Sequence, residues 1–539
     1  VGLLLNRLPF YCLILPLVLT IYSSYRTMKR IFLPLFLLAL LASTDLLAQI
    51  TPRTLPARVE DALRFGNVAP IGSARFAGTG GSMTSIGVDY TTLHTNPAGI
   101  GWNRYSSLQV TPGLSLNSLE TQLRGGNNAA ETETKVSLTV PSLGLVWAGD
   151  TRSVNFSTFN WGIGISRIAD FNETIAFDGR SVGGVIDAIV EDLNDDIGDP
   201  FRTDLIFDID PSIGPEVRDV AVDDRAVLFD DLGYYSLLDL SENQGISSRK
   251  TGRVERTGGI TEFSVGAGGN YREKILWGAA LGIPFVNFSE EKIYDEVDEG
   301  DQLLDFDDAG FNENLEFSGS GVNFKLGLIG RPTDQLRLSV AVHTPTFWTI
   351  DETYETDLEY NYTFAGDALG GNARSPRSEA AINLQTPWRF FFGGGYLIGR
   401  SGFISVDADY TNFAGNKFST ADFAEVDEAA NADVDATLGS SLGVRVGGEL
   451  NLKPLQIRAG VSYRQLPVLE ARYGEDEALL GLSAGLGYSV GKFFIDAAVR
   501  YEDSQGYYTP YRTFAFDGQI VDVNRTRISA LVTLGVRGF

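Results

Sequence analysis

Segments in which apolar and polar residues alternate make up most of the chain. In residues 455–464, for example, Leu455 and Ile457 lie on one face, and Arg458 and Arg464 lie on the other. Alternation with a period of two residues predicts β-strands with one apolar and one polar face. The segments are about 10–15 residues long, whereas strands of soluble sheets average about 5–6 residues. Because about 9–11 tilted residues cross a bilayer, we predict transmembrane strands.

Fourteen such segments follow one another along the chain. They lie at about 106–117, 134–148, 155–170, 259–272, 275–290, 313–331, 335–350, 379–398, 402–416, 439–451, 455–465, 478–490, 493–505 and 525–539. Short connections such as 332–334 and 399–401 alternate with long ones such as 171–258 and 351–378. This alternation is typical of outer-membrane barrels, which have tight turns at one end and long loops at the other. We therefore predict an all-β fold: a 14-stranded antiparallel transmembrane β-barrel at residues 106–539, with 171–258 as a long outer loop.

Residues 71–105, just before the first predicted strand, contain too much glycine for a regular helix or strand. Apolar side chains nevertheless recur among the glycines, and a flexible coil would not need them. They include Phe76, Leu93, Ile100 and Trp102. We predict that residues 49–105 form a plug inside the lumen of the barrel.

Two short motifs within this segment support that prediction: Ala77-Gly78-Thr79-Gly80-Gly81, and Asn96-Pro97-Ala98-Gly99 immediately before the first strand. Their arrangement resembles the hatch of the FadL/TodX outer-membrane hydrocarbon transporters. The motifs cover about 35 residues, and the strand layout extends the resemblance over the mature chain. The hatch residues that it implies are Gly78, Gly80, Gly81, Asn96, Pro97, Ala98 and Gly99.

The resemblance implies passive transport of hydrophobic small molecules, such as long-chain fatty acids, with release by movement of the plug. A ligand pocket between plug and barrel wall is expected from Phe76, Leu93, Ile100, Trp102, Phe390 and Phe392. In the family, an inward kink of the third strand opens a lateral path. Gly162 and Gly164 would provide that kink here, because glycine weakens a strand.

Strand alternation also predicts charged side chains that face the lumen. The arginines among them are Arg337, Arg445, Arg458 and Arg500. In a narrow lumen, such arginines would pair with carboxylates of the protein. Alternatively, one or two of them would bind the carboxylate head of an amphipathic ligand.

Targeting signals occupy residues 1–48. Met28–Ala48 has the basic, apolar and small-residue regions of a signal peptide. Residues 1–27 are an upstream extension, either an untranslated start or a second membrane anchor. The single cysteine, Cys12, lies in this part, so the mature chain is expected to have no disulfide. The expected location is the outer membrane.

Composition argues against other classes of function. The net charge of −26 disfavours nucleic acid as a partner. The chain has only two histidines, His94 and His343, and no Gly-x-Ser-x-Gly nucleophile motif. We therefore expect no catalytic site, no metal site and no cofactor.

The expected partners are hydrophobic small molecules or fatty acids, outer-membrane lipids, and the barrel assembly machinery through the C-terminal Phe539. The acidic outer loops leave an alternative open, in which a FadL-like barrel serves protein interaction in type IX secretion at the cell surface. A cation-selective diffusion porin is a third possibility. Apolar residues at helical spacing between Val182 and Leu193 predict a helix in the long loop.

Overall fold

The computed structural model describes most of the chain after residue 56. The described residues are 57–538 except 126, 152, 186–218, 223–224, 229–246, 301–302, 304–305, 365, 375–376, 420–423, 469–477 and 512–518. The predicted signal peptide, most of the predicted loop helix and Phe539 lie outside the described residues.

A single antiparallel sheet of 19 strands forms the wall of the barrel. Some consecutive short strands continue one another, so that the 19 strands make 14 passes from one end of the barrel to the other. Ten crossings are single strands: β1 (Ser107–Leu123), β2 (Glu131–Asp150), β7 (Ser248–Tyr271), β8 (Ile275–Val297), β9 (Phe306–Gly330), β17 (Ser440–Leu452), β18 (Leu455–Gln465), β19 (Ala478–Val490), β20 (Phe493–Tyr508) and β21 (Val521–Arg537). Four crossings are interrupted: β3 (Phe156–Asp170) with β4 (Glu173–Ser181), β10 (Leu336–His343) with β11 (Phe347–Phe364), β13 (Ser378–Gln385) with β14 (Arg389–Leu397), and β15 (Gly402–Asn412) with β16 (Lys417–Ser419).

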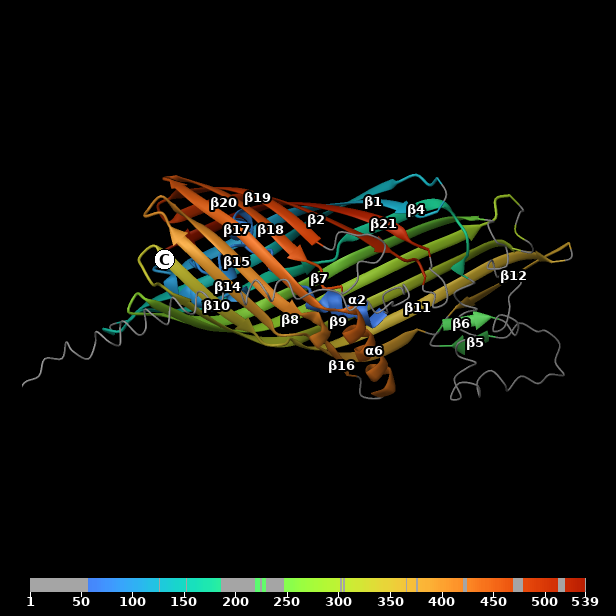
Figure 1. Ribbon diagram of the computed structural model, residues 1–539, viewed down its shortest axis with the longest axis horizontal. Coiled ribbons are helices and arrows are strands. Elements are labelled where there is room, and N and C mark those ends of the chain that lie inside the picture. Colours follow the sequence, from blue (N-terminus) through green and yellow to red (C-terminus); the bar gives the residue numbers. More distant parts are fainter. Residues whose placement is uncertain are drawn as a thin grey trace, which may run out of the picture. The chain divides into compact units, whose positions relative to one another are not determined.

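The wall closes on itself. β1 pairs with β2 on one side and with β21 on the other, from Ser107 opposite Arg537 to Leu123 opposite Val521. The closed ring leaves no free sheet edge at the junction of first and last strands (Figure 1). The predicted closed 14-stranded antiparallel barrel is confirmed.

The outer face near the short turns is apolar. On β18, Leu455 and Ile457 are exposed, whereas Arg458 is buried on the lumen side. Leu138 on β2 and Phe493 on β20 are 80% and 72% exposed. A continuous apolar belt of this kind is unfavourable in water and favourable against lipid. The wall is therefore built to lie in a membrane.

Several strands continue far beyond the length of a membrane crossing. β7, β8 and β9 have 24, 23 and 25 residues, whereas a crossing takes about 9–11. A further strand, β12 (Asp367–Arg374), pairs with the outer part of β11. The hairpin of β5 (Asp219–Val222) and β6 (Arg225–Leu228) forms a separate sheet.

These extensions correct the predicted loops. Residues 173–181 and 248–258 of the predicted 171–258 loop are strand, as is much of 351–378. The error has a physical reason: beyond the membrane, the outward face of a strand becomes polar. Glu316 of β9, for example, is exposed. The pattern of outward apolar residues that marks a membrane strand is therefore absent there, and buried apolar residues such as Phe311 lie on the inward face instead.

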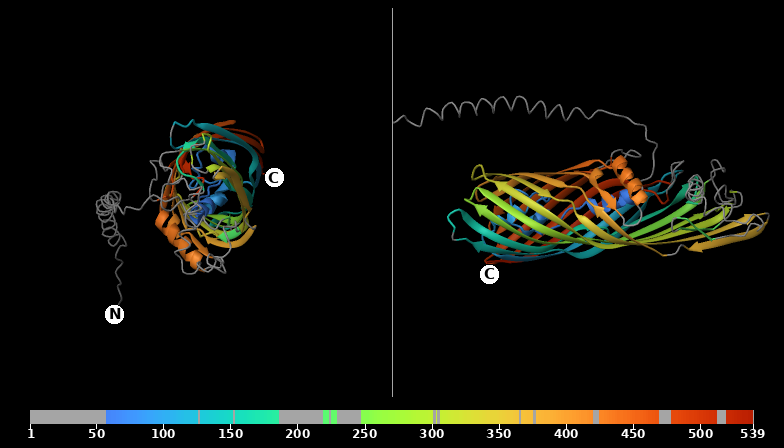
Figure 2. Two further views of the ribbon diagram at one scale, coloured as in Figure 1. Left: turned by 90° about the vertical axis from the view of Figure 1, so that its right-hand side faces the viewer. Right: turned by 90° about the horizontal axis from the view of Figure 1, so that it is seen from below.

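The N-terminal segment, which we define as residues 57–106, lies within the ring of strands (Figure 2). It contains α2 (Ala57–Gly66), α3 (Ala74–Gly78), η1 (Tyr90–His94) and η2 (Pro97–Trp102). α3 contacts β18 to β21, whereas η2 contacts β3 and β7 to β9 on another side of the barrel. α2 also packs against α6 (Ala424–Thr437). The segment thus bridges the lumen, and its role as a movable hatch stays a prediction.

The short helices of this segment begin at capping side chains. Ser73, Asp89 and Asn96 each accept a hydrogen bond from a backbone N–H of the first turn. None of the described helices is long and apolar enough to span a membrane.

β3 separates from β2 before β4 begins, although it stays paired with β7 as far as Asp170. Ser166 of β3 still pairs with Ser142 of β2, but none of the described residues of β2 before Ser142 pairs with β3 or β4. Pro141 lies next to this last pair and has no N–H to donate to the ladder. β4 pairs with β7 instead.

Candidate ligand-binding site

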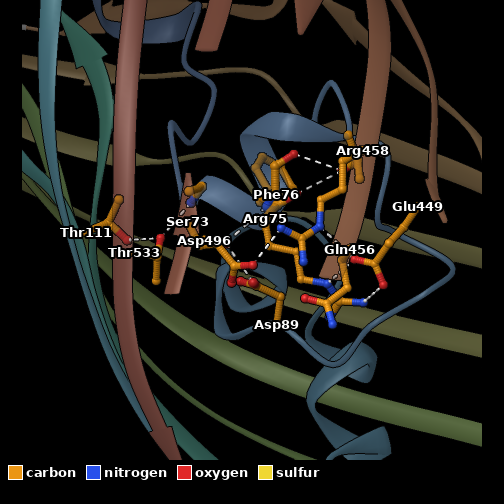
Figure 3. A network of polar contacts seen from close by, with 12 residues as sticks. Ser73, Arg75, Phe76, Asp89, Thr111, Glu449, Gln456, Arg458, Asp496 and Thr533 are labelled. Atoms are coloured by element: carbon orange, nitrogen blue, oxygen red, sulfur yellow. Dashed lines mark hydrogen bonds and ion pairs between the residues drawn. The ribbon is translucent and has the colours of Figure 1, made fainter. Parts of the chain in front are cut away.

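A chain of charged groups attaches α3 to the barrel wall (Figure 3). Arg75 donates from Nε and Nη2 to the Glu449 carboxylate, at 2.8 and 3.1 Å. Glu449 also accepts a hydrogen bond from Arg458 at 2.7 Å, and Arg458 donates to Asp496 at 2.6 Å. The four side chains are at most 14% exposed. Since each charge has an opposite partner, the network fixes α3 against β17, β18 and β20.

Glycines in the wall make room for the N-terminal segment. A Cβ atom on Gly144 would lie 2.1 Å from the Tyr90 ring, and one on Gly164 would lie 2.7 Å from it. A Cβ on Gly162 would lie 2.8 Å from Leu93. Gly162 and Gly164 are paired on both sides, with β2 and with β7. The predicted kink at these glycines is therefore wrong, because they accept side chains of the segment and the strand breaks between β3 and β4 instead.

The predicted hatch motifs lie where the segment contacts itself and the wall. Gly80 and Gly81 have φ of +65° and +77°, the left-handed region that favours glycine. Gly80 also lies against the backbone of Gly460. Asn96 accepts a hydrogen bond from the N–H of Ala98 at 3.1 Å. The motif residues therefore shape the turns of the segment, and a ligand contact by them stays untested.

A cavity of about 550 Å³ lies between the N-terminal segment and the wall. This size falls within the range of about 300–1,000 Å³ that is usual for small-molecule pockets. Its apolar lining consists of Leu63, Ile71, Phe76, Ile168, Phe171, Ile175, Phe288, Tyr463, Leu466, Val468, Leu479, Tyr508 and Val523. An amphipathic or hydrophobic ligand would thus find an apolar surface inside the barrel.

Charged side chains line the same cavity. Its arginines are Arg64, Arg256, Arg445, Arg464, Arg500, Arg525 and Arg527, and its carboxylates are Glu60, Asp170, Glu173, Asp409 and Glu502. The arginines outnumber the carboxylates, although the whole chain carries a net charge of −26. Five of these arginines are nevertheless paired with carboxylates, because Asp61 and Glu290, just outside the lining, pair with Arg64 and Arg256.

Two of these arginines differ from the rest in their partners. Arg464 donates to the Asn67 side chain at 3.1 Å, and Arg527 donates to the Asn117 side chain at 2.6 Å. Neither forms an ion pair with a carboxylate of the described residues, whereas Arg445 is paired with Asp409 at 2.5 Å. Arg464 and Arg527 are thus the cavity arginines best able to bind an external carboxylate.

The predicted pocket residues do not come together. Phe76 lines the cavity. Leu93 and Ile100 pack instead against the wall near β7. Trp102 lies beneath Arg337, whose guanidinium carbon is 4.5 Å from the ring centroid.

Phe390 and Phe392 do not face the lumen. They are 39% and 51% exposed on the outer face of β14, and the intervening Phe391 is buried on the lumen side. Assigning these two phenylalanines to the lumen was therefore wrong. The run Phe390–Phe392 is apolar at every position, so sequence alternation cannot decide which residue points inward.

The predicted lumen arginines all face inward. Arg445 and Arg500 line the cavity, and Arg500 pairs with Glu502 at 2.6 Å. Arg458 belongs to the network around α3, and Arg337 donates to the Ile86 carbonyl at 2.5 Å. The alternation of polar residues thus gave their direction correctly. It also marks Arg527, on the polar face of the last strand, which was not among the predicted site residues.

A second, smaller cavity of about 30 Å³ lies beside His94. His94 Nδ1 is 2.7 Å from Glu262, and Lys325 lies 2.5 Å from the same carboxylate oxygen. Burial lowers the pKa of His94, against the opposing effect of the hydrogen bond with Glu262. This cluster attaches η1 to β7 and β9.

Comparison with known proteins finds similarity to solved structures only. No family model matches the chain, and no curated protein matches it. A crystal structure of a Pseudomonas aeruginosa FadL homologue aligns over 88% of this chain and 99% of its own, with a TM-score of 0.51 and 13% identity. This chain has the fold of a FadL homologue. The predicted resemblance to FadL is therefore confirmed at the level of fold.

Two toluene transporters are less similar. TodX of Pseudomonas putida aligns over 87% of this chain and 98% of its own, with a TM-score of 0.48 and 12% identity. TbuX of Ralstonia pickettii gives the same coverage and identity with a TM-score of 0.45. Neither score is high enough to strengthen the assignment, and the FadL fold rests on the first comparison and on the closed 14-stranded wall.

Proposed function

We propose that this chain is a passive outer-membrane channel for hydrophobic small molecules, with long-chain fatty acids as the preferred class. The ligand is held between the N-terminal segment and the barrel wall and is released when that segment moves. The observation that carries the proposal is the cavity of about 550 Å³ between the two. Outer-membrane location is supported by the closed wall with its apolar outer belt and by the FadL fold.

The lining of this cavity favours a ligand with an acidic head and an apolar tail. Arg464 and Arg527 have no carboxylate partner among the described residues, while Phe76 and Phe171 provide apolar surface. A neutral hydrocarbon would use the apolar surface alone. A fatty acid would contact both the apolar surface and the arginines, because its carboxylate can accept hydrogen bonds from a guanidinium group.

Binding measurements on purified protein in detergent test this proposal. We expect a fluorescent long-chain fatty acid to bind saturably. The double variant Arg464→Met and Arg527→Met is expected to bind it about 10- to 100-fold more weakly, since hydrogen bonds to charged groups contribute about 1.5–3 kcal/mol. Binding of toluene, a neutral hydrocarbon, should change little.

Arg272→Met serves as the control, because Arg272 lies at an exposed turn and donates to Asn155 rather than to the cavity. Absence of fatty-acid and toluene binding by the unaltered protein would contradict the proposal. That result would favour the protein-secretion alternative, which capture of an exported protein at the cell surface would then test.

A further inference from the structure

Basic residues gather at the end of the barrel where the short turns lie. Five short turns, at 272–274, 331–335, 398–401, 453–454 and 491–492, each contain an arginine or a lysine. Together with the adjoining ends of the wall, this end carries Arg104, Arg272, Lys274, Arg331, Arg400, Lys453, Lys492 and Arg537. The acidic residues described in the same turns are Asp150, Glu273 and Asp334. The short-turn end is therefore basic in a chain whose net charge is −26.

Most of these cations have no carboxylate partner within the protein. Glu273 pairs with Arg104 at 2.7 Å and with Arg331 at 3.6 Å, and Asp334 pairs with Arg331 at 3.6 Å. Among the described residues, no ion pair with a carboxylate is formed by Arg272, Lys274, Arg400, Lys453, Lys492 or Arg537. Arginine and lysine side chains without an internal partner can bind an external phosphate.

Exposed aromatic side chains lie close to this basic end. Trp147 of β2 and Trp161 of β3 are opposite each other across the strand pair, a few residues from the turn that joins the strands. They are 65% and 57% exposed on the outer face. Because tryptophan in membrane barrels gathers at the boundary between lipid headgroups and acyl chains, the basic turns lie at the level of the headgroups of one leaflet.

The outer face of the wall is hollowed next to one of these turns. A groove of about 500 Å³ lies over β1, β20 and β21, on the side that faces lipid. Its outward side chains are Leu108, Val110, Leu143, Tyr488, Val490, Phe493, Ile495, Leu534 and Val536. We call it the outer groove. Its apolar lining suits a hydrocarbon chain and offers little to a polar ligand.

The outer groove ends at two cations. Lys492 directly precedes Phe493 of the lining, and Arg537 directly follows Val536. The backbone N–H of Arg537 donates to the carbonyl of Lys492 at 2.7 Å, so the two residues are neighbours. Like charges opposite each other on adjacent strands are unfavourable, and an anion bound there would offset this repulsion. The site thus combines an apolar groove with positive charge at the end where lipid headgroups lie.

We propose that the outer groove binds one anionic phospholipid of the leaflet at the short-turn end, with an acyl chain in the groove and the phosphate at Lys492. A net negative headgroup is preferred over a zwitterionic one, because the surrounding turns add further positive charge. This inference goes beyond the proposed transport function and does not depend on it, since the outer groove and the ligand cavity have no lining residue in common.

Lipid titration of the purified protein in detergent, read by native mass spectrometry, tests the headgroup part of the site. We expect one phosphatidylglycerol to be retained about 5- to 30-fold more tightly than phosphatidylcholine with the same acyl chains, since each of the two cations contributes a factor of about five. Lys492→Met should weaken phosphatidylglycerol about fivefold and leave phosphatidylcholine unchanged. Lys417→Met is the matched control, because Lys417 is an exposed lysine on β16, at the opposite end of the wall.

A second pair of variants tests the groove part of the site. Val110→Trp fills the outer groove, and we expect both lipids to bind several-fold more weakly. Val461→Trp makes the same change on the outer face of β18, where Val461 is 48% exposed and outside the groove lining, and it should leave both affinities unchanged. Far-ultraviolet circular dichroism checks that both variants keep the strands of the barrel.

Three results would overturn the proposal. Equal retention of the two lipids by the unaltered protein would show that the basic turns do not select an anionic headgroup. Equal retention by Val110→Trp and Val461→Trp would show that the acyl chain lies elsewhere. Loss of a dimer of the barrel in Val110→Trp, with lipid retention unchanged, would make the outer groove a contact between two copies of the chain.

Discussion

At the scale of single residues, glycine decides where the N-terminal segment can lie. The inner wall next to η1 has Gly144, Gly162 and Gly164 where side chains would otherwise project, and Tyr90 and Leu93 occupy that space. These two side chains fill the depressions that the glycines leave in the wall. Close packing of this kind tolerates little added volume.

The first prediction concerns this packing. Gly144→Ala places a Cβ atom 2.1 Å from the Tyr90 ring, so Tyr90 has to move. We expect a loss of about 1–3 kcal/mol in the stability of the docked segment, measured as faster hydrogen exchange in η1. Gly394→Ala is the control, because nothing lies within 4 Å of the added atom. Equal exchange in both variants would contradict the packing argument.

A second prediction at this scale concerns pH. Burial lowers the pKa of His94 below its ordinary value of 6.5, so the undocked segment binds more protons than the docked one. Docking is then strongest above about pH 7 and weakens as pH falls below 6.5. The protection factors of the η1 amides, which correct for the slower intrinsic exchange at lower pH, should fall as the pH is lowered from 7.5 to 5.5. In His94→Gln this dependence should be reduced, and an unchanged profile in that variant would assign the effect to another group.

At the scale of elements, alternation predicted the strands near the short turns well. On β18, Leu455 and Arg458 face the directions that their order in the sequence indicates. The prediction failed where the outward face is not apolar or the inward face is not polar. In the extension of β9 outside the membrane the outward Glu316 is polar, while the inward Phe311 is buried in an apolar cluster. At Phe390–Phe392 all residues are apolar. The inward turn of β4 was missed, because it depends on contacts with β1 that are distant in sequence.

The candidate ligand-binding site could also be predicted only in part from the sequence. Lumen arginines follow from alternation, but which of them lacks a carboxylate partner depends on how strands lie side by side. Arg445 and Arg464 are equivalent in the sequence pattern. Among the described residues, however, Arg445 pairs with the carboxylate of Asp409, whereas Arg464 donates to the Asn67 side chain. Pairing across strands cannot be read from one strand alone.

The prediction at this scale concerns the two attachments of the N-terminal segment. Arg75→Ala removes one partner of the buried Glu449 carboxylate, which keeps only Arg458. We expect a cost of about 2–3 kcal/mol, less than for a fully orphaned charge. Hydrogen exchange should increase in α3 but not in η2, which contacts the opposite wall. An equal increase in both would mean that the segment undocks as one unit.

At the scale of the whole molecule, the barrel has two parts with different surroundings. Near the short turns the outward side chains are apolar, and toward the far end, where β12 lies (Figure 1), the strands continue with polar outward side chains. Both parts share the same ladders, so hydrogen bonding does not distinguish them. The difference lies in the solvent that each outer surface meets.

β9 crosses both parts and allows a test within one strand. Leu326 is 57% exposed in the apolar belt, and Glu316 is exposed ten residues earlier. Leu326→Arg places a charge against lipid, and we expect a cost of about 2–4 kcal/mol near the bilayer centre. Glu316→Arg should cost almost nothing, because its surroundings are aqueous. Folding into lipid vesicles under urea titration measures both. Equal stability of the two variants would mean that the belt does not face lipid, and the membrane placement of the whole barrel would fail with it.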